Sequence, residues 1–180
     1  MKTRKAIKNA LMELMCSREI SKITIKDIAL AADINRKTFY THYTDVFSVL
    51  NDIENELMSK LINILNTFEI SEEKYNPYPI FKKLTEEINN DIEFYKLLLI
   101  YDSSSNLINK IALLLKEYIY KYCVSESDID NVSLPYINNF ISAGIISSYQ
   151  EWFNSDSKIT LEQLSETLSI FIADGINSLL

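Results

Sequence analysis

Residues 24–43 read TIKDIALAADINRKTFYTHY, and the order of residue types in this stretch decides the fold. Its first half places apolar side chains at the spacing of one face of an α-helix. Thr24, followed three residues later by Asp27, has the pattern of a capping box, in which two side chains satisfy free amides at a helix start. We therefore expect a short helix that begins just after Thr24. Its predicted buried face consists of Ile25, Ile28, Ala29 and Ala32.

A tight turn and a second short helix follow in the same stretch. Asp33 stands where the turn needs a residue that tolerates the left-handed backbone region, which Asp accepts better than most residues other than glycine. Asn35 is a favourable N-cap for a helix from Arg36 to about Tyr43. Within this helix Phe39 and Tyr43 lie one turn apart and face inward. The outward face then consists of Arg36, Lys37, Thr38, Tyr40, Thr41 and His42. Two short helices around a tight turn form a helix-turn-helix.

The rest of the chain predicts an all-α protein of about nine helices, because apolar residues recur at helical spacing throughout. Two glycines and three prolines in 180 residues are too few turn-forming residues for a multi-stranded sheet. A first helix over residues 3–17 has a basic start, and a long fourth helix runs from residue 45 to 68. The later predicted helices cover 80–89, 92–101, 107–123, 133–154 and the chain after Thr160, with loops at 69–79, 102–106 and 125–131. We expect two domains, a helix-turn-helix domain at residues 1–46 and a larger helical domain at residues 47–180.

Charge is divided unevenly between these two expected domains. Residues 1–46 hold nine Lys and Arg against five Asp and Glu, a net charge of +4, whereas the whole chain carries −7. Residues 47–180 therefore carry −11. A basic segment attached to an acidic one can approach a polyanion in one orientation only.

Several classes of protein are excluded by what the sequence lacks. The longest apolar runs are broken by polar residues before the ~18 that a membrane span needs. The charged N-terminus lacks the apolar core of a signal peptide, and the two lone cysteines, Cys16 and Cys123, suit a reducing compartment, so we expect a soluble cytoplasmic protein. The single histidine has no Ser, Cys or Asp partner at catalytic spacing. Paired carboxylates, metal-ligand spacings and phosphate-binding glycine loops are missing too, so we expect no enzyme activity, no metal and no cofactor.

The pattern T-I-x-x-I-A-x-x-A-x-I-x-x-x-T-F-Y-x-H-Y at residues 24–43, after a basic amphipathic helix, resembles the TetR/AcrR family of transcriptional regulators. The similarity extends to the long fourth helix, the helical body and the segment FISAGIISSYQEWF at residues 140–153. The resemblance implies a homodimer whose third helices enter successive major grooves of a roughly palindromic DNA operator.

The resemblance also implies which side chains meet DNA. Those expected to face base edges are Arg36, Lys37, Thr38 and Thr41, with Lys26 reaching toward the groove from the second helix and Asn35 at the start of the third. Those expected to meet phosphates are Thr24, Tyr40 and His42. Their chemistry agrees, because Arg suits bidentate contact with guanine and hydroxyl or imidazole donors suit phosphate oxygens.

Three positions depart from the family pattern. Val46 stands where many members have a Lys that contacts the DNA backbone, so one phosphate contact is expected to be missing. Asp33 replaces a common glycine in the turn. Lys37 replaces a frequent small residue, which is expected to alter the preferred DNA sequence.

The last two predicted helices are expected to form a dimer interface. Each is apolar on more than one side, and a helix of this kind must be buried on more than one side. A second copy of the chain supplies that additional burial most easily. The predicted interface residues are Ile141, Gly144, Ile145, Ser148, Leu164, Leu168, Phe171 and Ile172.

Aromatic residues of the larger domain suit a pocket for a small molecule, since such pockets are mostly apolar with a few polar groups. The predicted pocket residues are Tyr95, Tyr101, Tyr118, Tyr122, Tyr149 and Trp152. Tyr136 has the same character, and for each of these residues an ordinary place in the core is the alternative.

Together these features predict a repressor that a small-molecule ligand releases from its operator. The alternative function is that of an interaction protein that keeps the fold, has lost operator binding and docks on another protein. Val46 and the acidic domain favour this alternative, whereas the basic, hydroxyl-rich third helix opposes it.

Overall fold

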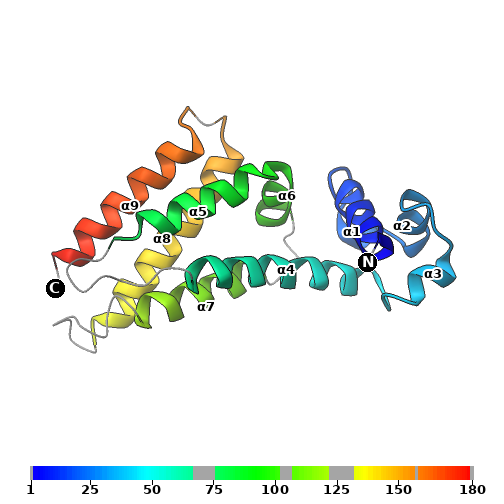
Figure 1. The fold of residues 1–180 in the computed structure, drawn as a ribbon, viewed down its shortest axis with the longest axis horizontal. Helices are drawn as coiled ribbons and strands as arrows, with labels where there is room; N and C mark the ends of the chain where they lie inside the picture. The colour runs from blue at the N-terminus through cyan, green and yellow to red at the C-terminus, as the bar shows by residue number, and fades with distance from the viewer. Residues whose placement is uncertain (1, 67–75, 102–106, 122–131, 157, 179–180) are drawn as a thin grey trace. The chain divides into compact units, whose positions relative to one another are not determined.

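The computed structural model describes residues 2–66, 76–101, 107–121, 132–156 and 158–178, with the backbone alone for residues 100 and 101. In these segments every regular element is helical, which confirms the predicted all-α class. The α-helices (Figure 1) are α1 (Lys2–Met15), α2 (Ile25–Ala31), α3 (Arg36–Tyr40), α4 (Val46–Asn66), α5 (Tyr78–Asn89), α6 (Ile92–Lys96), α7 (Leu107–Ile119), α8 (Leu134–Asn154) and α9 (Leu161–Asn177). A 3-10 turn, η1 (Ile20–Lys22), precedes α2, and a π-helical segment, η2 (Leu97–Tyr101), follows α6. The predicted loops at 102–106 and 125–131, and most of that at 69–79, lie outside the described residues.

The described residues divide into two compact units. The first contains Met1–Ser59 and Glu93–Ser105, and therefore α1 to α3, most of α4, most of α6 and η2. The second contains Lys60–Ile92 and Asn106–Leu180, and therefore the end of α4 together with α5, α7, α8 and α9. Helix α4 is continuous through the boundary between the two units.

Local hydrogen bonds build the helix-turn-helix as the sequence predicts. The Thr24 hydroxyl accepts a hydrogen bond from the Asp27 amide at 3.2 Å, and the Asp27 carboxylate accepts one from the Thr24 amide at 2.9 Å, which confirms the capping box. Asp33 has a φ of 51°, in the left-handed region expected of the turn. The Asn35 side chain caps α3 by accepting from the Thr38 amide at 2.8 Å. Both helices therefore start where their capping residues place them.

Helix α3 is anchored in the core of the first unit by its buried side chain Phe39. Ile7, Leu11, Ile28 and Phe39 are fully buried, and Tyr43 is nearly so. Helix α3 is shorter than predicted and ends at Tyr40, because the next residues form a turn whose amides donate to carbonyl groups three or four residues earlier. The inward positions of Phe39 and Tyr43 are nevertheless those expected from the sequence.

Asp45 caps the start of helix α4. The Asp45 carboxylate accepts a hydrogen bond from the Ser48 amide at 2.7 Å, which satisfies one of the free amides of the first turn. Phe47, an apolar residue in the first turn of this helix, is 55 % exposed. Val49, Leu50 and Ile53 supply the buried face here.

Two later helices also differ from their predicted lengths. The predicted helix over 92–101 is divided into α6 and the π-helical η2, and η2 packs against α1 in the first unit. The α-helical part of α7 ends at Ile119 and residues 120 and 121 are π-helical, whereas the predicted end at Cys123 lies outside the described residues. Helical periodicity continues across both places, so the sequence pattern does not reveal the change.

The second unit is built on helix pairs, with α5 beside α9 and α7 beside α8 (Figure 1). Thr160 caps α9 in a capping box with Gln163, as predicted. Three buried hydroxyl groups join α5, α8 and α9. The Ser165 hydroxyl lies 2.5 Å from that of Thr85 and 3.0 Å from that of Tyr149. Each of these polar groups therefore has a partner, as burial requires.

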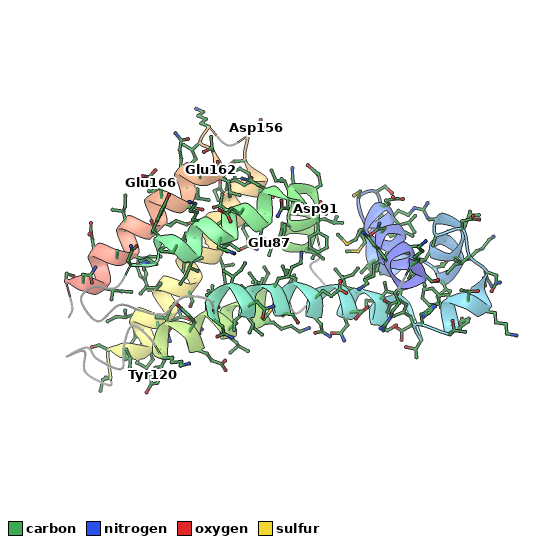
Figure 2. All side chains as sticks on the ribbon, in the orientation of Figure 1. Glu87, Asp91, Tyr120, Asp156, Glu162 and Glu166 are labelled. Atoms are coloured by element: carbon green, nitrogen blue, oxygen red, sulfur yellow. The ribbon has the colours of Figure 1, made fainter. Side chains whose placement is uncertain are left out.

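Acidic side chains project from the surface formed by α5 and α9 in the second unit (Figure 2). Some have local partners. Glu87 pairs with Lys60, and Glu162 accepts a hydrogen bond from Asn89 at 2.7 Å. Glu166 and Asp156 are exposed on the same unit, so the charge of this surface repels a polyanion.

Candidate nucleic-acid interface

The exposed residues of α2 and α3 form the candidate interface. Lys26, Arg36, Lys37 and Thr41 are exposed, and Tyr40 is 59 % exposed. Thr24 and Asn35, the capping residues, are also exposed, whereas Thr38 and His42 are half-buried. The structure thus places these residues on two consecutive helices and their capping positions, except His42, which lies in the turn after α3.

Four of these residues, Thr24, Asn35, Thr38 and Thr41, already use their polar groups within the protein. The Thr41 hydroxyl donates to the Thr38 carbonyl at 2.7 Å. The Asn35 side-chain oxygen accepts from the Thr38 amide and also from the Thr38 hydroxyl, at 3.1 Å. The Thr24 hydroxyl donates to the Asp27 carboxylate at 2.6 Å, and the Thr24 amide donates to the same oxygen. These hydrogen bonds, with Arg18 at 3.7 Å, hold the pKa of Asp27 below its usual value. A phosphate contact by the Thr24 hydroxyl therefore requires that hydroxyl to leave Asp27.

A network of polar groups ties the end of the helix-turn-helix to α1 and α4. The Tyr43 hydroxyl donates to the Asp52 carboxylate at 2.6 Å, and the Lys8 ammonium group lies 3.2 Å from that carboxylate and also pairs with Glu56. The Arg4 guanidinium carbon lies 5.2 Å from the centroid of the Tyr43 ring, a cation–π contact. This network fixes the position of the α3–α4 connection relative to α1.

The network also changes the acidity of its members. Burial, followed by the nearby Asp52, raises the pKa of Tyr43 well above its usual value. The hydrogen bond from Tyr43, supported by Lys8, holds the pKa of Asp52 below its usual value. Sequence reasoning missed Arg4, Lys8 and Asp52. The available signal was Tyr43 itself, because a buried tyrosine hydroxyl needs a hydrogen-bond partner.

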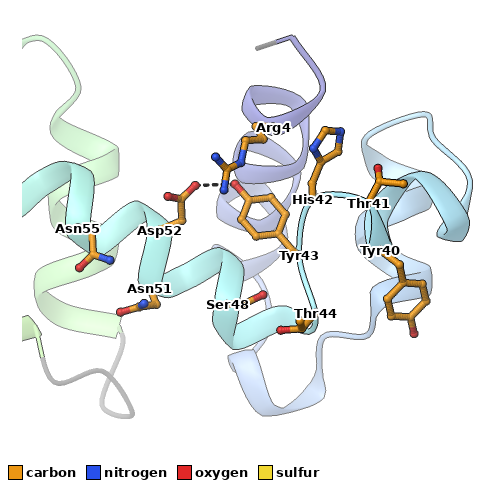
Figure 3. Close-up of a pocket in the computed structure, with 10 residues that line it drawn as sticks. All are labelled: Arg4, Tyr40, Thr41, His42, Tyr43, Thr44, Ser48, Asn51, Asp52 and Asn55. Atoms are coloured by element: carbon orange, nitrogen blue, oxygen red, sulfur yellow. Dashed lines mark hydrogen bonds between the residues drawn. The ribbon is translucent and has the colours of Figure 1, made fainter.

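A polar hollow of about 370 Å³ opens beside this network in the first unit (Figure 3). Its lining combines side chains of α1, the end of α3, the following connection and the first turns of α4. The lining residues include Arg4, Tyr40, Thr41, His42, Asn51 and Asp52. Two of the predicted phosphate contacts, Tyr40 and His42, therefore share one hollow.

The start of α4 offers no basic side chain. Val46 is 8 % exposed and belongs to the core, and the Asp45 carboxylate caps the helix. A carboxylate at this helix end places negative charge where a phosphate contact was expected to be missing. At the position of the Lys found in many family members, the structure therefore has a buried valine next to a capping carboxylate.

The aromatic residues predicted to line a ligand pocket belong to both units. Tyr95 is buried in the first unit, while Tyr118, Tyr149 and Trp152 belong to the second. The Tyr149 hydroxyl bonds to Ser165, and burial raises the pKa of Tyr149 to about 12. The Trp152 indole donates to the carbonyl of Ile159 at 3.0 Å. The Tyr101 side chain and Tyr122 lie outside the described residues.

The residues predicted to form a dimer interface do lie together, with one exception. Helices α8 and α9 line an apolar groove of about 550 Å³ in the second unit. Predicted residues on the groove are Ile141, Gly144, Ile145, Ser148, Leu168, Phe171 and Ile172. Leu164 is buried and is not among the residues that line the groove. Tyr136, Phe140 and Phe171 on its rim are 75 %, 67 % and 66 % exposed.

Neither a metal centre nor a membrane-spanning helix is found in the described part of the chain. Among these residues, no group of three or more His, Cys, Asp or Glu side chains could hold a metal ion. No described helix has both the length and the apolar character to cross a membrane.

Comparison with known proteins agrees with this architecture. Residues 75–174, more than half of the chain, match the family model TetR_C_8, described as a transcriptional regulator C-terminal region. A stretch of 55 residues is 36 % identical to the uncharacterized HTH-type transcriptional regulator YxbF of Bacillus subtilis (strain 168). That match covers 31 % of this chain and 14 % of the length of YxbF.

Solved structures show the same fold over nearly the whole chain. One is a Syntrophomonas wolfei protein assigned to the TetR family, with a TM-score of 0.78, 18 % identity and coverage of 99 % of this chain and 96 % of the other. Another is the dihydroxyacetone kinase operon activator DhaS, with a TM-score of 0.69, 21 % identity and coverage of 98 % and 97 %. Since members of the family are non-enzymatic DNA-binding regulators, the expectation that this protein is not an enzyme agrees with the family. The helix-turn-helix, the helical second unit and the family match together show that the chain belongs to the TetR family of transcriptional regulators.

Proposed function

We propose that this TetR-family regulator is a cytoplasmic homodimeric repressor that leaves its operator when a small molecule binds. In this proposal residues 1–46 form the DNA-binding domain, and residues 47–180 bind the ligand and form the dimer. The observation that carries it is the exposed face of α3, with Arg36, Lys37 and Thr41 projecting from a helix anchored by the buried Phe39.

The chemistry of this face suits the reading of DNA sequence. Arg36 can contact two acceptors of a guanine, Lys37 adds a second charge, and Thr41 can meet a thymine methyl group or an acceptor. Lys26 of α2, Asn35 and Thr38 complete the surface proposed to face bases. Thr24, Tyr40 and His42 are proposed to position the helix by contacting phosphates, which carry no sequence information.

Two copies are proposed to pair through the apolar groove of α8 and α9. Both glycines of the chain, Gly144 and Gly175, line this groove. Apart from its chain neighbours and the nearby backbone of its own helix, a Cβ added at either glycine would meet no described atom within 4 Å. Glycine within a helix costs about 0.5–1 kcal/mol relative to alanine, and contacts within one chain do not offset this cost. Close approach of a second copy would use the space that the glycines leave.

Ligand release is proposed to act through α4, which continues from the first unit into the second. The candidate pocket residues remain Tyr95, Tyr101, Tyr118, Tyr122, Tyr149 and Trp152. A ligand shifts the equilibrium only if it binds the released state more tightly than the DNA-bound state. Measurement of operator affinity with and without the true ligand tests this mechanism, and an unchanged affinity rules it out.

Binding to the DNA that flanks the gene of this protein tests the DNA-binding part of the proposal. We expect a gel shift whose affinity falls steeply with salt, because released counterions contribute to binding. Substitution R36A should reduce the preference for the flanking DNA over unrelated DNA by about 1–3 kcal/mol. The matched control K82A, at an exposed position of α5, should leave this preference unchanged.

An interaction protein without operator binding is the alternative function. Binding that is absent, or insensitive to salt, would favour this alternative. A reporter gene under the flanking DNA then decides the direction of regulation. Deletion of a repressor raises its expression, whereas deletion of an activator, the function named for DhaS, lowers it.

A further inference from the structure

We propose that the hollow beside Tyr43 is a binding site for a phosphate of the operator backbone, and that Arg4 of α1 contacts this phosphate. The inference rests on the proposed DNA binding and extends it to α1, outside the helix-turn-helix. Arg4 is not among the residues that the sequence motif assigns to DNA.

Arg4 is held in place without using its charge in a salt bridge. Its guanidinium group lies over the Tyr43 ring, with 5.2 Å between the guanidinium carbon and the ring centroid. Within the described residues, the salt bridges of the first unit involve Lys8, Arg18 and Lys22, and none involves Arg4. Arg4 is exposed and lines the hollow. A guanidinium that is already oriented loses little side-chain entropy when it binds a phosphate.

Asp52 lines the same hollow and must be considered, because a carboxylate repels a phosphate (Figure 3). Its charge is already met by two other groups. Lys8 lies 3.2 Å from the carboxylate, and the Tyr43 hydroxyl donates to it at 2.6 Å. Arg4 also lowers the pKa of Asp52 through its charge, but no salt bridge joins the two side chains in the described part of the chain, so the guanidinium donors can still contact an incoming anion.

The other lining groups favour a phosphate over a cation or an apolar ligand. Asp52 is the one carboxylate among the lining residues that the structure describes. The hydroxyl groups of Thr41 and Ser48 already donate to the carbonyl oxygens of Thr38 and Asp45, at 2.7 Å and 2.6 Å. The other lining side chains include the hydroxyl group of Tyr40 and the imidazole of His42. Such groups can donate hydrogen bonds to phosphate oxygens. Tyr40 and His42 are themselves proposed phosphate contacts, and they line the same hollow as Arg4.

The salt dependence of DNA binding tests this assignment. Each phosphate contact contributes about 0.9 to the slope of log affinity against log salt concentration. Substitution R4Q should therefore reduce the slope by about 1.8 for a dimer with two such contacts. The loss of affinity should be the same on the flanking DNA and on unrelated DNA. Substitution R4K keeps the charge and should keep the slope.

The control is K5Q, which removes the same charge from the next residue of α1, outside the lining of the hollow. Its slope should stay close to that of the unsubstituted protein. An unchanged slope in R4Q, or an equal loss in K5Q, overturns the assignment to Arg4. If the unsubstituted protein shows no salt-dependent DNA binding, the proposed function itself fails, so the two failures are distinguishable.

Two further measurements test the folding of the variant and the source of the phosphate. Thermal unfolding shows whether R4Q is folded. If R4Q is not folded, R4M replaces it in the test, because methionine keeps an unbranched apolar side chain over Tyr43. Inorganic phosphate added at constant ionic strength distinguishes a free anion from the DNA backbone. We expect inorganic phosphate to leave DNA binding unchanged. If millimolar phosphate instead competes with DNA for the natural protein but not for R4M, the hollow binds a free phosphate and the assignment to the DNA backbone is wrong.

Discussion

Asp33 places a side chain in a backbone conformation that suits glycine. Its φ of 51° lies in the left-handed region, where a Cβ approaches the following carbonyl oxygen. Asp tolerates this region better than most residues, which is why the sequence pattern could predict its role. The turn between α2 and α3 is therefore formed at a cost that glycine would avoid.

Substitution D33G should stabilise the protein by about 0.5–1 kcal/mol. It removes the Cβ that is strained at positive φ, and this gain exceeds the loss caused by the greater freedom of the unfolded chain. Chemical denaturation followed by circular dichroism measures the change. The control D33A keeps the Cβ, but alanine tolerates the left-handed backbone region less well than Asp. D33A should therefore be less stable than the natural chain. A D33G protein that unfolds at lower denaturant concentration would contradict this account of the turn.

Asp52 gives the first unit a dependence on acid. Its pKa is held below the usual value by the Tyr43 hydrogen bond, so the folded state binds a proton less readily than the unfolded state. The stabilisation is therefore present above a pH of about 4 and is lost as the pH falls through the lowered pKa.

Substitution D52N should cost about 1 kcal/mol of unfolding free energy at neutral pH, and the difference should shrink toward pH 3. Denaturant titrations between pH 7 and 3 measure it. D174N, at an exposed carboxylate of α9, serves as the control and should change stability by less than about 0.5 kcal/mol. A constant difference between D52N and the natural chain at all pH values would show that Asp52 acts through its shape alone.

At the scale of elements, capping residues fix where helices begin, but packing decides where several of them end. Thr24, Asn35 and Thr160 cap α2, α3 and α9 as the sequence predicts, since a cap involves residues only three positions apart. The early end of α3 and the change from α6 to η2 had no such signal. Both occur where apolar residues continue at helical spacing, so periodicity alone could not locate them.

Ser165 is the centre of the hydroxyl cluster that joins α5, α8 and α9. Substitution S165A leaves the buried hydroxyl groups of Thr85 and Tyr149 without this partner and should cost about 2 kcal/mol. The control T167A, at an exposed position of the same helix, should cost less than about 0.5 kcal/mol. Thermal unfolding of both variants measures the difference. Equal stability of the two would show that the cluster does not hold these helices together.

At the scale of the whole molecule, the apolar groove on α8 and α9 is the feature that one chain leaves incomplete. Aromatic residues on its rim, Tyr136, Phe140 and Phe171, are more than half exposed. Exposed aromatic side chains gathered along one groove are typical of interaction sites. The proposed second copy would cover it with an identical surface, as two-fold symmetry requires.

Substitution F171E should convert the proposed dimer into monomers, because it places a charge on the rim of the proposed interface, where Phe171 would be covered by the second copy. Light scattering after size-exclusion chromatography measures the molar mass. Ile170 offers a matched control, since it is 56 % exposed on the same helix but does not line the groove. I170E should remain a dimer. A monomeric natural chain, or an F171E protein that is still dimeric, would contradict the proposed interface.

The sequence alone determined the all-α class, the helix-turn-helix and the capped helix starts, because these depend on interactions within about four residues. It also identified most of the residues that line the groove, since both helices show an excess of apolar positions. The tertiary structure decided which distant residues meet. Lys8 reaches Asp52, Arg4 lies over Tyr43, and Ser165 joins Thr85. These partners are far apart in the chain, and only the packing of helices brings them within bonding distance.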